Sequence, residues 1–264
     1  MADIVCQLPA IIHLSKSEHV DFLISDFHQL IEYLVDSYDI SIINKKENPI
    51  DSDFFNDKNM VKKSMINIWF DYFFGDYTKF DLSARSLPQY VSKKPKLNNI
   101  VALHPTYREK AQKLDYIVWK HIIDYIQNKG YYVLFVGRAF GNNYDVDTKL
   151  WKYTNKFTLL ESLDIISRSK LLITPIDGFA ILGGCTNTNM LCFSTRLEPS
   201  PFLPIRTNGI TKCLDTLIDC KWCTTKKVLE NTELFDKTCD KNYECTKRFN
   251  FDEIDSSIDF LLNI

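Results

Sequence analysis

The chain has 264 residues, of which 45% are hydrophobic and 13% aromatic, so it can bury the core of one large domain or of two modest ones. Its 32 basic and 34 acidic residues give a formal net charge of -2, which argues against a surface that binds nucleic acid in general. No run approaches the roughly 20 apolar residues that span a bilayer, and the N-terminus lacks a secretory pattern. We therefore expect a cytoplasmic protein without a transmembrane segment.

Residues 1–95 alternate helical and extended patterns less regularly than the remainder. Residues 4–14 begin like a loop that enters a helix, and further patterns predict a strand at 20–25, a helix at 27–36, a strand at 40–43, a polar loop at 44–59 and a helix at 61–74. The stretch 92–98 combines Pro95 with charged residues, which is typical of a linker. We place a domain boundary there, dividing the chain into 1–95 and 96–264.

The second part alternates strands and helices clearly. The predicted elements are a strand at 99–103, a helix at 115–129, a strand at 131–137, a helix at 158–169, a strand at 171–174, a helix at 179–186 and a strand at 190–193. Thr158 and Glu161 have the spacing of a capping box, and Gly130 ends the preceding helix. Trp119 lies on the apolar side of its predicted helix, so we expect it in the core.

This alternation predicts parallel strands joined by right-handed crossovers, as in a Rossmann-like sheet. Ligands bind such sheets where the strands end at their carboxyl side. The loops to consider are therefore 104–114, 137–143 and 175–178. Asp145 and Asp147, in the second part of the chain, match the Asp-x-Asp pattern of metal sites, but we expect them to face solvent.

Four cysteines form a cluster near the C-terminus with the spacing C-x2-C-x15-C-x5-C: Cys220, Cys223, Cys239 and Cys245. A tight C-x2-C turn followed by a second pair across a loop is typical of a tetrahedral thiolate metal site. Four thiolates leave no open position, so the ion would be structural, and both iron and zinc suit such a site. A zinc ribbon for nucleic acid is disfavoured by the nearly balanced charge of the segment. The other four cysteines are expected in the core.

Several short motifs, in shared order, resemble the heptosyltransferase family of GT-B glycosyltransferases, which is glycosyltransferase family 9. They are residues 2–10 (ADIVCQLPA) followed by 20–24 (VDFLI), residues 102–105 (ALHP) through Trp119 to Gly137, and residues 171–193 with Asp177-Gly178. The cysteine spacing is similar to the four-cysteine iron finger of the autotransporter heptosyltransferases, a subgroup that glycosylates protein. The resemblance implies a GT-B-like α/β fold with two Rossmann-like domains, a reduced N-terminal acceptor-side domain and a four-cysteine metal finger over 220–245.

The sequence also departs from the family pattern. Ala2 replaces a glycine, and Ile181 stands where the family's donor turn has a histidine. The family has a strand before its Gly-Asp loop, whereas this sequence starts at the loop, which predicts a reduced N-terminal half. Asp177 is shifted by one residue relative to the family's acid.

The resemblance assigns roles to particular residues. Asp3 matches the family's catalytic carboxylate and would deprotonate the acceptor hydroxyl, although a frayed terminal residue is an equal alternative. His13 is a second candidate base. Lys113 and Arg108 would contact the donor diphosphate, or simply be solvated, with Arg138 a weaker candidate.

The donor turn supplies two more candidates. Gly178 would let the donor approach the backbone, and Asp177 would hold a sugar hydroxyl or cap the following helix. Together these residues predict a glycosyltransferase that moves a sugar, with heptose from ADP-heptose as the named example, from a nucleoside diphosphate donor to a protein or glycan hydroxyl without a catalytic metal. The alternative is a catalytically inactive relative that serves binding or assembly. A homo-oligomer stays open.

Overall fold

The structure is a computed structural model, and it describes residues 2–24, 28–44, 62–105, 113–137, 156–229, 239 and 241–264. Arg108, Arg138, Asp145 and Asp147 lie outside the described residues, as does most of the predicted polar loop at 44–59.

The N-terminal part contains two strands and several helices. Its elements are α1 (Ala2–Leu14), β1 (Val20–Ile24), α2 (His28–Val35), β2 (Ile40–Asn44), α4 (Met65–Phe74), the short 3-10 helix η1 (Tyr77–Lys79) and α5 (Leu82–Arg85). β1 and β2 pair in parallel, with Val20 opposite Ile40. The predicted strands and helices of this part are confirmed, with one difference. Helix α1 already begins at Ala2 and continues through Pro9, so the loop expected at its start is helical.

The second part is built around a five-stranded sheet. Its elements are β3 (Leu97–Leu103), α6 (Tyr116–Asn128), β4 (Tyr132–Phe135), α8 (Leu159–Arg168), β5 (Ser169–Pro175), α9 (Gly178–Gly184), β6 (Asn189–Ser194), β7 (Thr211–Asp215), α10 (Cys223–Leu229), η3 (Glu244–Thr246) and α11 (Phe251–Asn263). The strand order is β4-β3-β5-β6-β7, and every neighbouring pair is parallel. The predicted parallel α/β sheet is confirmed, while β7, α10 and α11 were not predicted.

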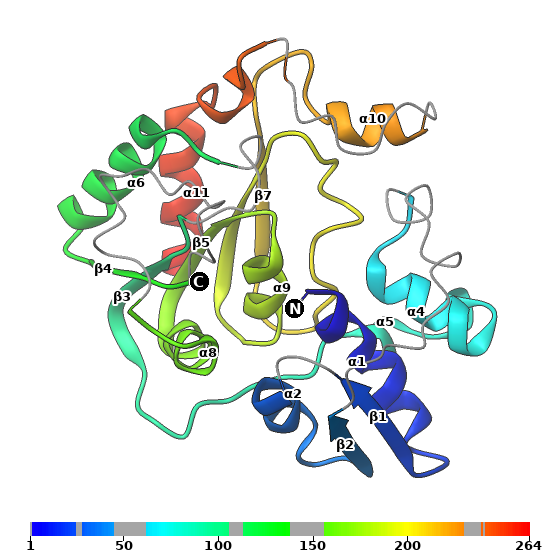
Figure 1. Ribbon diagram of the computed structural model, residues 1–264. Helices are drawn as coiled ribbons and strands as arrows, with labels where there is room; N and C mark the ends of the chain where they lie inside the picture. The colour runs from blue at the N-terminus through cyan, green and yellow to red at the C-terminus, as the bar shows by residue number, and fades with distance from the viewer. Residues whose placement is uncertain are drawn as a thin grey trace.

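Side chains on both faces of the sheet are buried, which gives three layers. On one face α6 and α11 cover β3, β5 and β6 through a cluster that includes Trp119, Leu171, Phe193 and Ile258. On the other face α8 and α9 cover the sheet, with Ile166, Leu182, Leu172 and Met190 in contact. Figure 1 shows α6 and α11 together on one side and α8 and α9 on the other. The helices lie on opposite faces because the right-handed crossover from β3 to β4 and the one from β4 to β5 run in opposite directions across the sheet.

Helix α1 joins the N-terminal part to this sheet. Leu8, Ala10 and Ile11 are buried in the same hydrophobic cluster as the α8 and α9 face of the sheet. α1 packs against both α4 and α9, and Figure 1 shows it in front of the sheet next to α9. The two parts therefore share a core, and the division at residue 95 stays a prediction.

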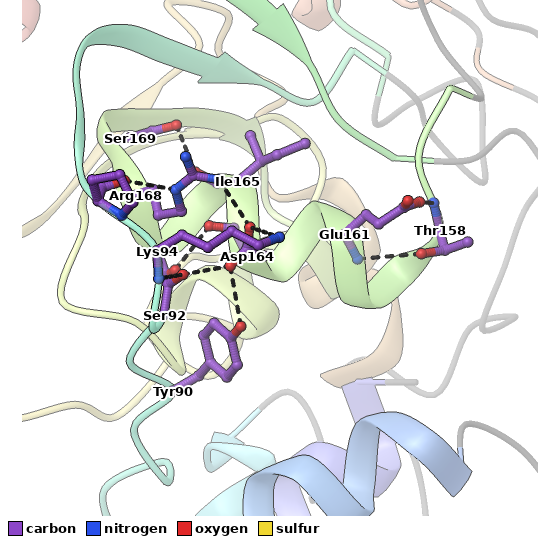
Figure 2. Close-up of polar contacts among 11 residues, drawn as sticks. Tyr90, Ser92, Lys94, Thr158, Glu161, Asp164, Ile165, Arg168 and Ser169 are labelled. Atoms are coloured by element: carbon purple, nitrogen blue, oxygen red, sulfur yellow. Dashed lines mark hydrogen bonds and ion pairs between the residues drawn. The ribbon is translucent and has the colours of Figure 1, made fainter.

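The segment predicted as a linker is firmly bound to α8. Figure 2 shows Ser92 and Tyr90 donating hydrogen bonds to Asp164 Oδ1 over 2.5 and 3.3 Å, while Lys94 Nζ lies 3.2 Å from Asp164 Oδ2. The same figure shows Thr158 and Glu161 closing the predicted capping box, which is confirmed. Residues 92–98 are thus an ordered strap rather than a free linker, and their last two residues already belong to β3.

Candidate functional site

The carboxyl ends of β3 and β5 form the topological switch point of the sheet. From β3 the chain goes to β4 on one side, and after β4 it crosses to β5 on the other side. The connecting helices α6 and α8 lie on opposite faces of the sheet, and open α/β sheets bind their ligands at such a point. The residues that follow these strands are His104 after β3 and Ile176, Asp177 and Gly178 after β5.

His104 and Asp177 meet at this point. His104 Nε2 lies 2.9 Å from Asp177 Oδ2, and the two side chains are only 4% and 14% exposed. The Nδ1 atom of His104 lies 3.2 Å from the carbonyl oxygen of Val136 at the end of β4. A carbonyl can only accept, so Nδ1 donates to it, and Nε2 faces the Asp177 carboxylate. The imidazole stacks on Phe179, with ring centroids 3.9 Å apart.

The carboxylate of Asp177 caps helix α9. Its Oδ1 accepts a hydrogen bond from the Phe179 N–H over 2.8 Å and a longer one from the Thr174 hydroxyl over 3.4 Å. The capping alternative for Asp177 is therefore observed, and its second oxygen faces His104. Gly178 is the first residue of α9, so the two predicted donor residues lie at the switch point. Their contact with a donor stays a prediction.

The remaining predicted site residues are more dispersed. Lys113 is partly buried and lies two residues before Asp115, which caps α6 by accepting from the Ile117 N–H. Asp3 lies in the first turn of α1, the helix that packs against α9. His13 lies at the other end of α1, where its ring packs edge-on against Phe74 and Phe80. Burial lowers the pKa of His13, which agrees with a structural role.

A second group of residues at the same edge was not predicted. The loop after β6 lines a small cavity with the end of β5, formed by Pro175, Ile176, Phe193, Ser194, Thr195, Arg196 and Leu197. Arg196 is only 5% exposed, which is unusual for an arginine side chain. It is therefore buried at the carboxyl edge of the sheet, in the lining of this cavity. His104 was also missed as an individual residue, although its loop was selected. The signal in both cases is a charged or titratable residue directly after a buried parallel strand.

The four clustered cysteines are brought near one another by the fold. Burial, together with the charges of the neighbouring Cys223, Cys239 and Cys220, raises the pKa of the Cys245 thiol to about 12. The Tyr243 N–H donates to the Cys239 sulfur over 3.4 Å. Within the described residues, however, no group of three or more His, Cys, Asp or Glu side chains converges closely enough to hold a metal ion. The donor set suits iron or zinc, whereas the present arrangement does not close into a cage.

The other cysteines behave as expected for core residues. Cys6, Cys185 and Cys192 are buried, and Cys213 is partly buried and packs against the same core. Burial raises the pKa of Cys185 and of Cys192 to about 12, so both thiols stay protonated at neutral pH. In the described part of the chain, no helix has both the length and the apolar composition that crossing a bilayer requires.

Comparison with solved structures shows a shared fold. The iron-containing dodecameric glycosyltransferase TibC from enterotoxigenic E. coli H10407 aligns with a TM-score of 0.69 and 16% identity, covering 100% of this chain and 76% of TibC. TibC in complex with ADP-D-beta-D-heptose aligns with a TM-score of 0.60 and 14% identity, over 92% of this chain and 76% of the other.

Two further structures give the same picture. The glycosyl transferase family 9 protein from Veillonella parvula DSM 2008 aligns with a TM-score of 0.65 and 12% identity, covering 99% of this chain and 94% of the other. The E. coli heptosyltransferase WaaC with ADP aligns with a TM-score of 0.61 and 8% identity, over 98% and 96%. No protein-family model and no curated protein sequence matches the chain. At these identities the likeness establishes the α/β fold of GT-B-like glycosyltransferases and nothing finer.

Proposed function

We propose that this protein transfers a sugar from a nucleoside diphosphate donor to a hydroxyl acceptor. The observation that carries the proposal is the meeting of His104 and Asp177 at the switch point of a fold shared with glycosyltransferases. Buried polar side chains need partners, and His104 and Asp177 provide them for each other at the edge where open α/β sheets bind their ligands. The donor would enter between the ends of β3 and β5, close to Gly178.

The roles within the reaction follow from chemistry at this edge. Transfer forms a bond between an acceptor oxygen and the anomeric carbon while the bond to the diphosphate breaks, so the acceptor loses a proton and the diphosphate gains negative charge. Asp3 is proposed as the base, on the helix that packs against α9. Lys113 and Arg108 are proposed to stabilise the departing diphosphate by their positive charge. ADP-heptose is the first donor to test, because a similar fold binds it in TibC.

The cysteine cluster is proposed to hold a structural iron or zinc ion through Cys220, Cys223, Cys239 and Cys245. Support comes from the spacing of the four cysteines and from the iron content of TibC. Such an ion would stabilise the C-terminal segment and take no part in transfer. A thiol-reactive dye and elemental analysis test this: one metal per chain and four protected thiols are expected, and reaction of all four thiols in the folded, metal-free protein would contradict it.

Donor binding is tested by thermal unfolding in the presence of ADP-heptose, ADP-glucose, UDP-glucose, GDP-mannose, ADP and AMP. A ligand present at 100 times its dissociation constant stabilises the folded state by about 2.7 kcal/mol, which raises Tm by several degrees. We expect one diphosphate donor to give this shift and AMP to give less. No shift with any member of the panel would reject the proposal.

Catalysis is tested with Asp3→Ala. We expect this variant to lose sugar transfer to a hydroxyl acceptor while its dissociation constant for the donor stays within about twofold of the wild type, since a base acts only in the chemical step. Asp21→Ala, which removes an exposed carboxylate of the same N-terminal part, is the matched control. Unchanged turnover in Asp3→Ala would remove Asp3 from the mechanism.

A catalytically inactive binding or assembly protein is the second candidate. The observation that favours it is the burial of Ile176 and Ile181, which are 5% and 7% exposed and belong to the hydrophobic core, although Ile181 takes the place of a histidine in the family's donor turn. Tight donor binding without transfer, in both the wild type and Asp3→Ala, would favour this candidate.

A further inference from the structure

The cysteine-bearing segment contacts two separate loops at the carboxyl edge of the sheet. We refer to the described residues 220–226, 239 and 241–246 as the finger segment. It follows β7, and Figure 1 shows α10 beyond the end of that strand, at the top of the view. The structural ion proposed above would stabilise the C-terminal segment. That role does not explain why hydrogen bonds of the finger segment reach the loops around the candidate site.

The first contact joins the C-x2-C turn to the loop after β6. The Trp222 N–H donates to the Thr195 carbonyl over 3.0 Å, and the Thr224 N–H donates to the Arg196 carbonyl over 3.1 Å. In the opposite direction, the Glu198 N–H donates to the Thr225 hydroxyl over 3.0 Å. Three bonds from neighbouring residues fix both the position and the orientation of this loop.

Trp222 is held in an unusual backbone conformation. Its φ of 61° lies in the left-handed region, which is a genuine outlier for a bulky residue. Such strain persists where the surroundings determine the conformation. Here the indole N–H also donates to the Asp215 carboxylate at the end of β7, over 3.3 Å. The turn is therefore fixed on two sides, by β7 and by the loop after β6.

That loop is part of the candidate donor edge. It lines the small cavity together with Pro175 and Ile176, and the Ile176 N–H donates to the Phe193 carbonyl over 3.1 Å. Asp177, which pairs with His104, is the next residue along the chain. The loop after β6 and the end of β5 that precedes Asp177 therefore line one cavity at the carboxyl edge of the sheet.

The second contact lies on the other side of the switch point. The Thr246 carbonyl, next to Cys245, accepts from the Asp115 N–H over 2.9 Å. Asp115 begins α6 and ends the loop that carries Lys113, and the intervening Leu114 is buried in the core. The half of the finger segment that contains Cys245 therefore binds the end of the loop after β3, at Asp115, while the half that contains Cys220 and Cys223 binds the loop after β6.

From these contacts we propose that the finger segment is a strut that sets the spacing of the two loops flanking the donor site, so that its integrity and donor affinity are coupled. The inference rests on the proposed function, because it assumes a donor at this edge. Thr224 and Thr225 act as positioning residues through the loop after β6. Coupling between two sites is reciprocal: whatever loosens the finger segment weakens donor binding, and bound donor tightens the finger segment.

Two substitutions remove single bonds of the strut in the full-length protein. Thr224→Pro removes the N–H that binds the Arg196 carbonyl, at a position in the first turn of α10 where proline is tolerated. Thr225→Val removes the hydroxyl that accepts from Glu198 and keeps the side-chain volume. Thr224→Ser and Thr225→Ser are matched controls, since they keep the N–H and the hydroxyl.

ADP is the probe, and its dissociation constant is measured by calorimetry at a temperature where every variant is folded. We expect Thr224→Pro and Thr225→Val to weaken ADP binding about fivefold or more, and the serine controls to bind within about twofold of the wild type. With donor and acceptor substrates, the donor KM should rise while the acceptor KM stays constant. A purely structural role would lower Tm without this selective change.

The reciprocal arm measures the reaction rate of the finger cysteines with a thiol reagent. Saturating ADP should slow this reaction in the wild type, and Thr225→Val should lose that protection. ADP binding of equal affinity in all variants, or thiols that react at the same rate with and without ADP, would overturn the strut alone. A wild-type protein that binds neither ADP nor any sugar nucleotide overturns the proposed function and the strut with it.

Discussion

At the scale of single residues, buried acidic and histidine side chains connect segments that are distant in the sequence. His104 and Asp177 connect the ends of β3 and β5, and Asp164 connects α8 to the strap before β3. Asp164 is 12% exposed, yet it has four polar neighbours: Ser92, Tyr90, Lys94 and Arg168. Isolated buried carboxylates are destabilising, so these contacts are needed for the charge to be tolerated.

The network around Asp164 predicts an acid-sensitive contribution to stability. Burial alone would raise the pKa of Asp164. Hydrogen bonds from Ser92, Arg168 and Lys94 lower this pKa by more than burial raises it, so the pKa lies below its ordinary value of 3.8. A depressed carboxylate pKa means that the unfolded state binds the proton more readily. The stabilisation is therefore present above about pH 4 and is lost as the pH falls through the folded-state pKa.

Asp164→Asn is expected to lower the free energy of unfolding at pH 7 by about 1 to 3 kcal/mol, because Lys94 and Arg168 lose their charged partner. Urea unfolding at several pH values measures this, and the difference from the wild type should shrink below about pH 4. Asp124→Asn is the matched control, since its i,i+4 pair with Lys120 is half exposed and its loss should change the free energy of unfolding much less than Asp164→Asn does. A difference that is independent of pH would contradict the assignment.

At the scale of elements, close packing of α9 fixes the position of the turn at Asp177 and Gly178. Gly183 and Gly184 end this helix, and both are fully covered. A Cβ added at Gly184 would overlap the ring of Pro204 and the side chain of Leu87. Small residues here let α9 approach the segments on either side, and that approach holds Asp177 and Gly178 at the strand ends.

Gly184→Ala is predicted to destabilise the protein by about 1 to 3 kcal/mol, because Pro204 cannot move aside without shifting the backbone. The sign of this change in stability is informative, because Ala is otherwise preferred over Gly in a helix by about 1 kcal/mol. Chemical unfolding measures the change. Gly75→Ala is the control, at an open position with a φ of 81°, where only backbone strain of about 1 kcal/mol is expected. Greater stability of Gly184→Ala would show that the packing relaxes easily.

At the scale of the whole molecule, α1 makes the two parts of the chain interdependent. Its side chains belong to the same hydrophobic cluster as α9 and the sheet, and Leu8 is completely buried. A domain with a core of its own unfolds as a unit, and parts that share a core unfold together.

Leu8→Ala is therefore expected to destabilise the entire protein by about 2 to 5 kcal/mol in one transition. Circular dichroism follows all helices, and in a background with Trp69, Trp151 and Trp222 replaced by Phe the fluorescence of the buried Trp119 follows the five-stranded sheet, so the two probes should give the same midpoint. Tyr33→Ala, at an exposed position on α2, is the control, with little change expected. A midpoint shift seen by circular dichroism but absent from Trp119 fluorescence would mean that residues 1–95 unfold independently.

The regular elements were predictable because their signals are local. Asp115, Thr158 and Glu161 mark helix starts by bonds to nearby backbone atoms, and the apolar runs of β4, β5 and β6 predict buried parallel strands by themselves. The unpredicted helix α11 carries Ile254, Ile258 and Leu261 on one buried face, so its pattern was also present in the sequence. β7 was harder, since Lys212 and Asp215 interrupt its apolar character.

Sequence alone thus determined the α/β class, most helices and strands, the cysteine spacing and the loops that follow the parallel strands at their carboxyl ends. Only the tertiary structure decided which of those loops meet, because the pairing of His104 with Asp177 depends on strand order, which no local pattern encodes. The same holds for the helical start of α1 and for the strap bound to Asp164, where packing outweighed local preference. The contacts of the finger segment with Thr195, Arg196 and Asp115 are the clearest case, since they join residues from distant parts of the sequence at one edge of the sheet.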